Sequence, residues 1–163
     1  MIYLLGVYHC FQTKEYPEFL AYVRDFCDSH GINSLAEEMN CTALRDAKRN
    51  RSTIKMVADE RLLPHAYCDP DEKERETLGI AGEYRLKFLQ WFYTWTEEEF
   101  RSRKTLENQK REIIWLDRLQ KIFIDPMLFV CGIDHLILFS ALLERSGFSF
   151  QIADRTWTMN NCA

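Results

Sequence analysis

Two short segments at opposite ends of the sequence place a histidine three residues after a glycine. Gly6-Val7-Tyr8-His9 follows an apolar run near the N-terminus, and Gly132-Ile133-Asp134-His135 follows another near the C-terminus. An imidazole exchanges protons near neutral pH or ligates a metal ion, and a glycine lets the backbone turn sharply or approach a ligand closely. The repeated pattern predicts that His9 and His135 work at one site.

Acidic residues follow two further apolar runs. Glu37 and Glu38 lie at the end of the run 32–39, and Asp69 follows the run 63–68. Successive side chains of a strand face opposite sides, so Glu37 and Glu38 cannot both point into a site, and one of them is expected to be solvated or paired. Asp69 has a structural alternative, because an aspartate before Pro70 is also suited to cap the next helix.

Two imidazoles and a carboxylate suit Zn, Mn, Fe or Co and leave positions open for water and substrate. The expected metal ligands are His9, His135 and Glu37. A bound metal would acidify its water, and a second carboxylate could take the proton. The expected catalytic group is therefore His9, Glu37, Glu38 and His135. The structural alternative is that each histidine is only a hydrogen-bonded, half-buried residue at a strand end.

Three neighbouring residues are candidates for substrate binding: Tyr8, Asp69 and Arg75. Arg75 would supply a cation for a carboxylate or an oxyanion. His65 is a reserve metal ligand, although a structural role is favoured for it. His30 precedes Gly31 at a predicted helix end, where a cation complements the helix dipole, and it is assigned no chemistry.

Cysteines offer a different chemistry. Cys10, Cys68 and Cys131 each lie near a predicted strand end, where a thiol nucleophile could pair with His9 or His135. The favoured interpretation is that they are small buried apolar residues.

The segments that must position these residues alternate between strands and helices. Short apolar runs predict strands at 2–8, 32–39, 63–68, 127–131 and 148–152. Three- and four-residue spacing predicts helices at 15–30, 42–62, 71–78 and 135–146. Residues 83–124 form a helical insertion of two helices, about 80–125 with its connections, and Thr96 caps the second helix.

This order predicts an α/β fold in a single domain, residues 1–163. The expected sheet is open and mostly parallel, has about five strands and carries helices on both faces. In such sheets the ligand crevice lies beyond the carboxyl ends of the strands. The predicted fold would therefore bring the candidate residues to one edge.

Composition limits the class of protein. The chain has 163 residues, 47% of them hydrophobic, and a net charge of −4, so a dedicated nucleic-acid binder is disfavoured. Six dispersed cysteines predict reduced thiols. No signal peptide or membrane span is recognisable in the sequence. The expected location is cytoplasmic.

Two further features point to partners. Basic residues cluster in 45–55 and again in 101–111, the pattern of solvated helix faces, although the first cluster could attract an anionic partner. The aromatic residues in 91–95 are more than one helix face can bury. They are expected to pack the insertion on the sheet, to line a substrate pocket, or to form a homodimer contact.

The Gly-x-x-His segments ending at His9 and His135, with Ala36-Glu37-Glu38 between them, resemble a known superfamily. It groups the TraB and PrgY proteins, Tiki proteases, ChaN-type haem-binding lipoproteins and erythromycin esterases. The resemblance implies a hydrolase, metal-dependent in some branches, with His9, Glu37 or Glu38, and His135 in the active site. The chain is short for that group and carries Tyr8 and Asp134 beside the histidines, which leaves the substrate open.

The sequence thus predicts a hydrolase with a His/Glu/His site, acting on a small-molecule or peptide substrate. One alternative is a non-catalytic protein in which the same histidines bind haem or another ligand. Another is a regulatory protein whose basic second helix docks an acidic partner.

Overall fold

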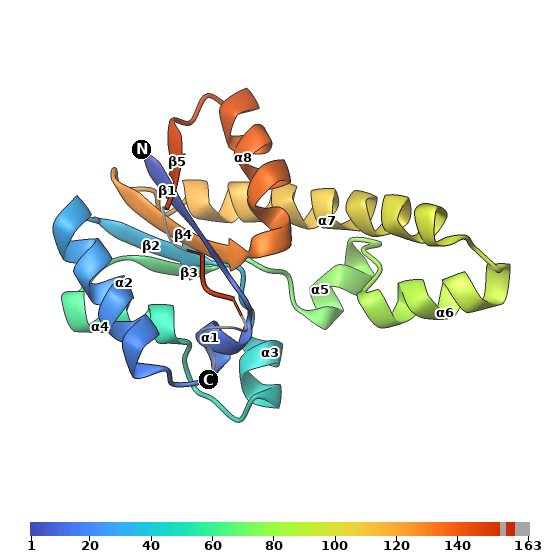
Figure 1. Ribbon diagram of the computed structural model, residues 1–163, viewed down its shortest axis with the longest axis horizontal. Helices are drawn as coiled ribbons and strands as arrows, with labels where there is room; N and C mark the ends of the chain where they lie inside the picture. The colour runs from blue at the N-terminus through green and yellow to red at the C-terminus, as the bar shows by residue number, and fades with distance from the viewer. Residues whose placement is uncertain (154–155, 159–163) are drawn as a thin grey trace.

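The computed structural model describes residues 1–153 and 156–158 of the chain. Within these residues, five strands form one open sheet in the order β3-β2-β4-β1-β5, and every pairing is parallel (Figure 1). The strands are β1 (Ile2–Val7), β2 (Ser34–Glu37), β3 (His65–Tyr67), β4 (Met127–Gly132) and β5 (Phe150–Ile152). The predicted α/β fold with a parallel open sheet is confirmed.

Helices cover both faces of the sheet, as the continuous apolar strands predicted. On one face, α2 (Pro17–His30) and α4 (Thr53–Arg61) pack against alternate side chains of the strands, among them Leu5 and Val130. On the other face, α8 (Leu136–Arg145) and the C-terminal half of α7 (Glu97–Gln120) pack against Leu4 and Phe129. The central strands β1 and β4 are therefore buried from both sides.

The predicted single helix at 42–62 is wrong, because the structure has two helices there, α3 (Cys41–Asp46) and α4. Lys48 lies just after α3 and has a positive φ of 56°, which interrupts the helical backbone. The side chain of Ser52 then accepts a hydrogen bond from the backbone N–H of Lys55 and caps α4. A further short helix, α1 (Cys10–Thr13), is too short to show a periodic pattern.

Two of the later helices begin at residues whose side chains cap them. Asp71, not Asp69, caps α5 (Glu72–Thr77), where it forms a capping box with Glu74. Thr96 caps α7 as predicted, and a 3-10 turn, η1 (Ile133–His135), leads into α8. In the part of the chain that the structure describes, no helix combines the length and the apolar character needed to cross a bilayer.

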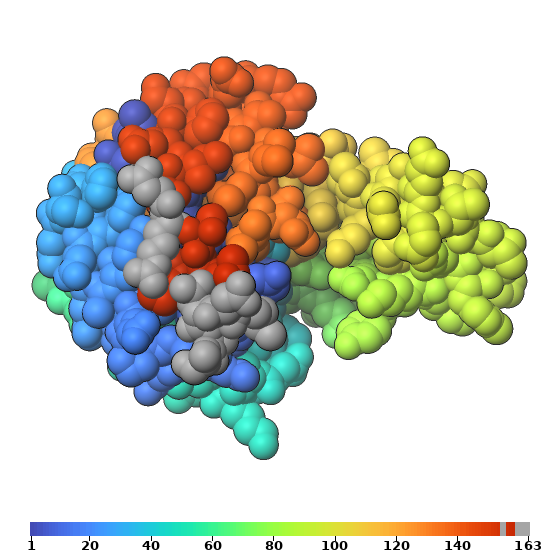
Figure 2. Space-filling view, in the orientation of Figure 1, coloured from blue at the N-terminus to red at the C-terminus, as the bar shows by residue number. Residues whose placement is uncertain are grey.

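The helical insertion forms an arm. Helix α6 (Glu83–Tyr93) packs along the N-terminal half of α7, and Figure 1 shows this pair extending away from the sheet. Figure 2 shows the same pair projecting beside the body of the molecule. We call residues 83–110 the helical arm.

The carboxyl ends of β1 and β4 lie at the switch point of the sheet, where the connections that follow two neighbouring strands run in opposite directions. These strands are neighbours, with Val7 in register with Gly132. The chain leaves β1 for α2 on one face, whereas it leaves β4 for α8 on the opposite face. A crevice beyond the carboxyl ends of such a strand pair is the usual ligand site of an open parallel sheet. His9 and His135 follow these two strand ends.

Candidate active site

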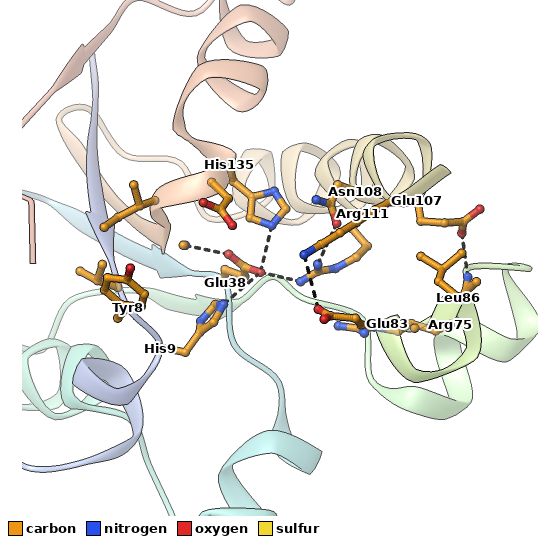
Figure 3. Close-up of a pocket in the computed structure, with 17 residues that line it drawn as sticks. Tyr8, His9, Glu38, Arg75, Glu83, Leu86, Glu107, Asn108, Arg111 and His135 are labelled. Atoms are coloured by element: carbon orange, nitrogen blue, oxygen red, sulfur yellow. Dashed lines mark hydrogen bonds and ion pairs between the residues drawn. The ribbon is translucent and has the colours of Figure 1, made fainter. Parts of the chain in front are cut away.

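The side chains of His9, Glu38 and His135 meet beyond the carboxyl ends of the strands (Figure 3). The Nε2 atom of His9 lies 3.7 Å from Oε1 of Glu38, and the Nε2 atom of His135 lies 3.5 Å from the same oxygen. These residues follow β1, β2 and β4, which are adjacent in the sheet. The structure therefore brings together three of the four residues expected to be catalytic.

His135 is held by a carboxylate from the helical insertion. Its Nδ1 atom lies 2.7 Å from Oε1 of Glu112, and both side chains are buried. Since an ionised carboxylate only accepts hydrogen bonds, Nδ1 of His135 carries the proton in this contact. The indole of Trp115 packs edge-on against the imidazole, with ring centroids 4.7 Å apart. The Nε2 atom on the other side of the ring faces Oε1 of Glu38, and this contact is favourable when Nε2 also carries a proton.

His9 is held in an equivalent way by Gln12. The amide nitrogen of Gln12 donates to Oε2 of Glu37 at 2.9 Å and to the carbonyl oxygen of Glu38 at 3.4 Å. Because both of these partners are acceptors, they fix the orientation of the amide and leave its oxygen to face Nδ1 of His9 at 3.1 Å. Nδ1 of His9 is therefore the donor, and Nε2 is the acceptor turned toward Glu38.

Glu38 is buried at the centre of this group. Its Oε2 accepts a hydrogen bond of 2.8 Å from the backbone N–H of Gly132, and its Oε1 accepts one of 2.5 Å from the guanidinium of Arg111. Hydrogen bonds from a cation and from a backbone N–H stabilise the ionised form of a carboxylate. Glu38 thus presents a negative charge to both imidazoles.

The glycines of the two motifs are required by close packing. A Cβ atom at Gly132 would lie 3.2 Å from Oε2 of Glu38 and 3.3 Å from Nε2 of His9. At Gly6 it would lie 2.6 Å from Cδ1 of Leu136, at the start of α8. Gly132 therefore lets the carboxylate and the imidazole approach the backbone, whereas Gly6 lets α8 approach β1.

Glu37 points to the opposite face of the sheet. Its carboxylate is fully buried and accepts hydrogen bonds from Gln12, from the hydroxyl of Ser52 and from Nε2 of His65, the last at 2.9 Å. Glu37 was expected to be a catalytic residue and a metal ligand, but the structure separates its carboxylate from the side chains of the other candidates. His65, considered as a reserve ligand, is occupied by Glu37 instead.

Arg111 is held in place by Asp69. The guanidinium Nε of Arg111 donates to Oδ1 of Asp69 at 2.8 Å, and Trp115 donates to the same oxygen at 3.1 Å. The other oxygen accepts hydrogen bonds from Arg75 and Asn40. Burial by itself would raise the pKa of Asp69, but the attraction of Arg111 and Arg75 is stronger and lowers that pKa.

The same contacts act on the arginine. Burial opposes the charge of Arg111, but Glu38 and Asp69 raise its pKa above the ordinary value. Arg111 is therefore a largely buried, permanent cation between two carboxylates. Its side chain is only 14% exposed, so it does not belong to the solvated helix face that the sequence pattern indicated for 101–111.

A cavity of about 360 Å³ opens between this group and the helical arm. His9, Glu38, His135 and Arg111 line it on the side of the sheet, and Leu86 of α6 lines it on the side of the arm. Of the candidates for substrate binding, Tyr8 and Arg75 line this cavity. Asp69 borders a smaller adjoining hollow, and both of its carboxylate oxygens are already hydrogen-bonded. Asn108 and Asp134 also contribute to its polar wall.

The expected metal ligands do not form a metal site. Among the residues that the structure describes, no group of three or more His, Cys, Asp or Glu side chains is arranged to hold a metal ion. Glu37 is turned away, and the oxygen of Glu38 that faces both imidazoles is already bound by the cation of Arg111. The three residues expected as ligands therefore do not surround one point.

Two of the three thiols near the strand ends, Cys68 and Cys131, are unsuited to nucleophilic attack. Burial raises the pKa of Cys68 to about 12 and that of Cys131 well above its ordinary value, so both remain protonated at neutral pH. Cys10 is half-buried and packs against the core on the face covered by α2 and α4. The favoured interpretation as apolar core residues is confirmed for Cys68 and Cys131. Cys162 lies outside the described residues.

Sequence reasoning missed Gln12, Arg111 and Glu112. One usable signal was the four-, three- and four-residue spacing of a series in α7, which places its members on one face of the helix: Lys104, Asn108, Arg111 and Trp115. A large aromatic residue in such a series indicates that the face is covered. No comparable signal marks Gln12.

These side chains are the basis for a functional proposal. Neither a family of known proteins, nor a curated protein, nor a solved structure matches the chain.

Proposed function

We propose that the protein is a hydrolase that cleaves an ester or amide bond with His9, Glu38 and His135. One observation carries the proposal. Both imidazoles have their Nδ1 atoms held by acceptors, so both Nε2 atoms turn toward the same oxygen of Glu38 at the wall of an open cavity. Oriented in this way, a histidine can exchange protons with a bound water or a leaving group.

The partners of the two rings suggest different roles. Gln12 is neutral, and His9 is half exposed at the cavity, so His9 is suited to accept a proton from water. Glu112 is a carboxylate that stabilises positive charge on the buried ring of His135, which is suited to donate a proton to the leaving group. Glu38, between them, stabilises whichever ring is protonated.

The reaction then balances without another reactant. The oxygen of water bonds to the carbonyl carbon while one of its protons moves to Nε2 of His9. In this mechanism His135 begins the cycle with a proton on each ring nitrogen, and the bond from carbon to the leaving oxygen or nitrogen breaks as Nε2 of His135 donates its proton to that atom. The proton on His9 then passes by way of solvent to return His135 to its starting state. The positive charge of Arg111 lies beside the cavity where negative charge develops.

The test is hydrolysis of a panel of p-nitrophenyl esters and p-nitroanilides by the purified chain. His9→Ala and His135→Ala are each expected to lower turnover by about 10²- to 10⁴-fold, the typical size of a general acid or base contribution. His30→Ala is the matched control, because His30 ends α2 far from the cavity-lining residues, and it should retain activity. Full turnover in both site variants, with unchanged unfolding curves, contradicts the proposal.

The same geometry supports one alternative. A cavity of about 360 Å³ is large enough for a small ligand, and two Nε2 atoms on its wall could bind haem iron or another cofactor. A Soret band in the purified protein, together with no hydrolysis of the panel, favours this ligand-binding protein over the hydrolase.

The regulatory alternative has weaker support. In the basic cluster of 45–55, Arg49 forms an ion pair with Glu15, while Arg51 and Lys55 both pair with Asp59. Two carboxylates of the chain, Glu15 and Asp59, therefore neutralise part of the charge expected to attract an acidic partner.

A further inference from the structure

The helical arm carries an exposed aromatic face that the proposed hydrolysis does not use. Four side chains of α6 lie on one side of this helix with most of their surface in solvent: Tyr84 (92% exposed), Phe88 (58%), Trp91 (76%) and Phe92 (60%). Leu86 lies on the opposite side of α6 and is buried. We call the four exposed residues the aromatic stripe.

The aromatic stripe is too large to be explained as scattered surface residues. Phe88 contacts both Trp91 and Phe92, with ring centroids 6.0 and 6.2 Å apart, so these three rings form a continuous patch, and Tyr84 precedes Phe88 by about one helical turn on the same side. At about 200 Å² for a whole aromatic side chain, four rings with these exposed fractions present roughly 550 Å². A patch of this size is as large as the largest apolar patch on a typical monomeric protein, and such patches are often functional.

Charges around the aromatic stripe indicate what covers it. Arg85 and Lys87 flank the stripe near the start of α6, while Glu97, Glu98 and Glu99 gather at the far tip of the helical arm. Some of these charges have local partners: Lys87 pairs with Glu83, Glu97 accepts a hydrogen bond from Gln90, and Glu99 belongs to the capping box of α7.

Two charges of opposite sign are left over. Among the described residues, neither Arg85 nor Glu98 has a hydrogen-bond or ion-pair partner within the chain. They lie near opposite ends of the helical arm, so a second arm laid antiparallel on the first would bring each Arg85 close to the Glu98 of the other copy. Two-fold symmetry repeats the contact, which is how identical subunits form a closed dimer.

We propose that the aromatic stripe is the interface of a homodimer in which the α6 helices of two copies pack antiparallel. Coverage of both stripes would bury roughly 1,100 Å², just below the range of about 1,200–2,000 Å² for stable interfaces and above the minimum of about 1,000 Å² for a biological one, as fits a dimer in equilibrium with its monomer. The acidic tip argues against an anionic membrane as the alternative occupant, because Glu97, Glu98 and Glu99 would be repelled by its surface.

The first test measures the mass of the full chain by sedimentation equilibrium over a range of concentrations. We expect a monomer–dimer equilibrium. Trp91→Glu and Phe88→Glu should each weaken it by at least about tenfold, since large aromatic residues dominate interface energies. Ile137→Glu is the matched control: Ile137 is 79% exposed, but it belongs to α8 on the body of the molecule, so the equilibrium should not change.

The second test addresses the antiparallel arrangement. Arg85→Glu and Glu98→Arg should each weaken the dimer, and the double variant should restore it, because the charges are exchanged in both copies. A double variant weaker than either single variant overturns the antiparallel pairing. A chain that is monomeric at all concentrations, or that binds phosphatidylcholine vesicles as a monomer, overturns the dimer itself.

Discussion

Glu37 and Glu38 are adjacent in the sequence, yet their carboxylates lie on opposite faces of the sheet. Glu37 is bound by Ser52 and His65 on the side covered by α4, while Glu38 is bound by Arg111 from α7 on the other side. Alternation along an extended backbone separates the two carboxylates. Gln12 and His9 connect the two glutamates again. The amide nitrogen of Gln12 donates to Glu37, its oxygen accepts from Nδ1 of His9, and Nε2 of His9 faces the carboxylate of Glu38.

This arrangement predicts different effects for two conservative substitutions. Glu38→Gln should lower turnover by about 10²-fold or more, because the negative charge shared by both imidazoles is lost. Glu37→Gln should mainly lower stability, because the buried oxygens that accept three hydrogen bonds are disturbed. Turnover per folded molecule and urea unfolding separate the two effects. A Glu37→Gln variant that is stable but inactive would contradict this assignment, because it would show that Glu37 carries the catalytic charge.

Gln12 is expected to fix the tautomer of His9. Gln12→Met keeps the length of the side chain but removes the acceptor for Nδ1, so the tautomer protonated at Nε2 should become populated. We expect kcat to fall about tenfold with little change in KM, in line with the modest size of one positioning hydrogen bond. Nitrogen-15 NMR of the His9 ring reports the tautomer directly. An unchanged His9 spectrum in the variant would contradict this role.

Metal removal should leave activity intact. Arg111 already occupies the carboxylate oxygen that faces the two imidazoles, and a divalent cation would have to displace this buried guanidinium. We therefore expect equal turnover before and after treatment with EDTA, and elemental analysis without a stoichiometric metal. Loss of activity that added zinc restores would support the metal site predicted from His9 and His135.

Asp69 should contribute stability that depends on pH. Its pKa is lowered in the folded protein, because Arg111 and Arg75 outweigh the effect of burial, so folding favours the ionised form. Asp69→Asn leaves Arg111 short of one charge partner, and breaking a buried pair costs about 3–5 kcal/mol. The exposed pair of Asp117 with Lys121 at the C-terminal end of α7 provides the control. Asp117→Asn should lower the free energy of unfolding by less than about 1 kcal/mol.

The direction of that pH dependence follows from the lowered pKa of Asp69. Its contribution is fully present above the ordinary aspartate pKa, about 3.9, and is lost as the pH falls through the lower value of the folded state. The stability difference between wild type and Asp69→Asn should therefore be constant near neutral pH and shrink in acid. Urea unfolding over this range measures it, and a difference that grows in acid would contradict the assigned shift.

The buried thiols should be dispensable for catalysis. Cys68→Ala and Cys131→Ala are expected to keep turnover while losing some stability, because each thiol packs in the core beside Trp115 and Phe129. In the native protein, iodoacetamide should label the exposed Cys41 and leave both buried thiols unmodified. Labelling of Cys131 with a matching loss of activity would support the hypothesis that this thiol is a catalytic nucleophile.

The strands could be predicted because their pattern is local. Continuous apolar runs such as 127–131 identify strands buried on both faces, and Gly31, which has a positive φ of 60°, marks the end of α2 as the sequence indicated. The break between α3 and α4 was missed, because the residue with the left-handed backbone there is Lys48 and not a glycine, the residue type that usually marks such a position. A helix of four residues, α1, is likewise shorter than any periodic signal.

The site was only partly predictable. Local sequence pattern was enough to predict that His9 and His135 follow two buried strands and that only one of two adjacent glutamates can face a common site, since strand periodicity is a property of the local chain. Only the packing of distant segments showed that this glutamate is Glu38, and it added Arg111 and Glu112 from an insertion far along the sequence. Hydrogen bonds between distant segments depend on how helices pack on a sheet, and no local pattern records that packing.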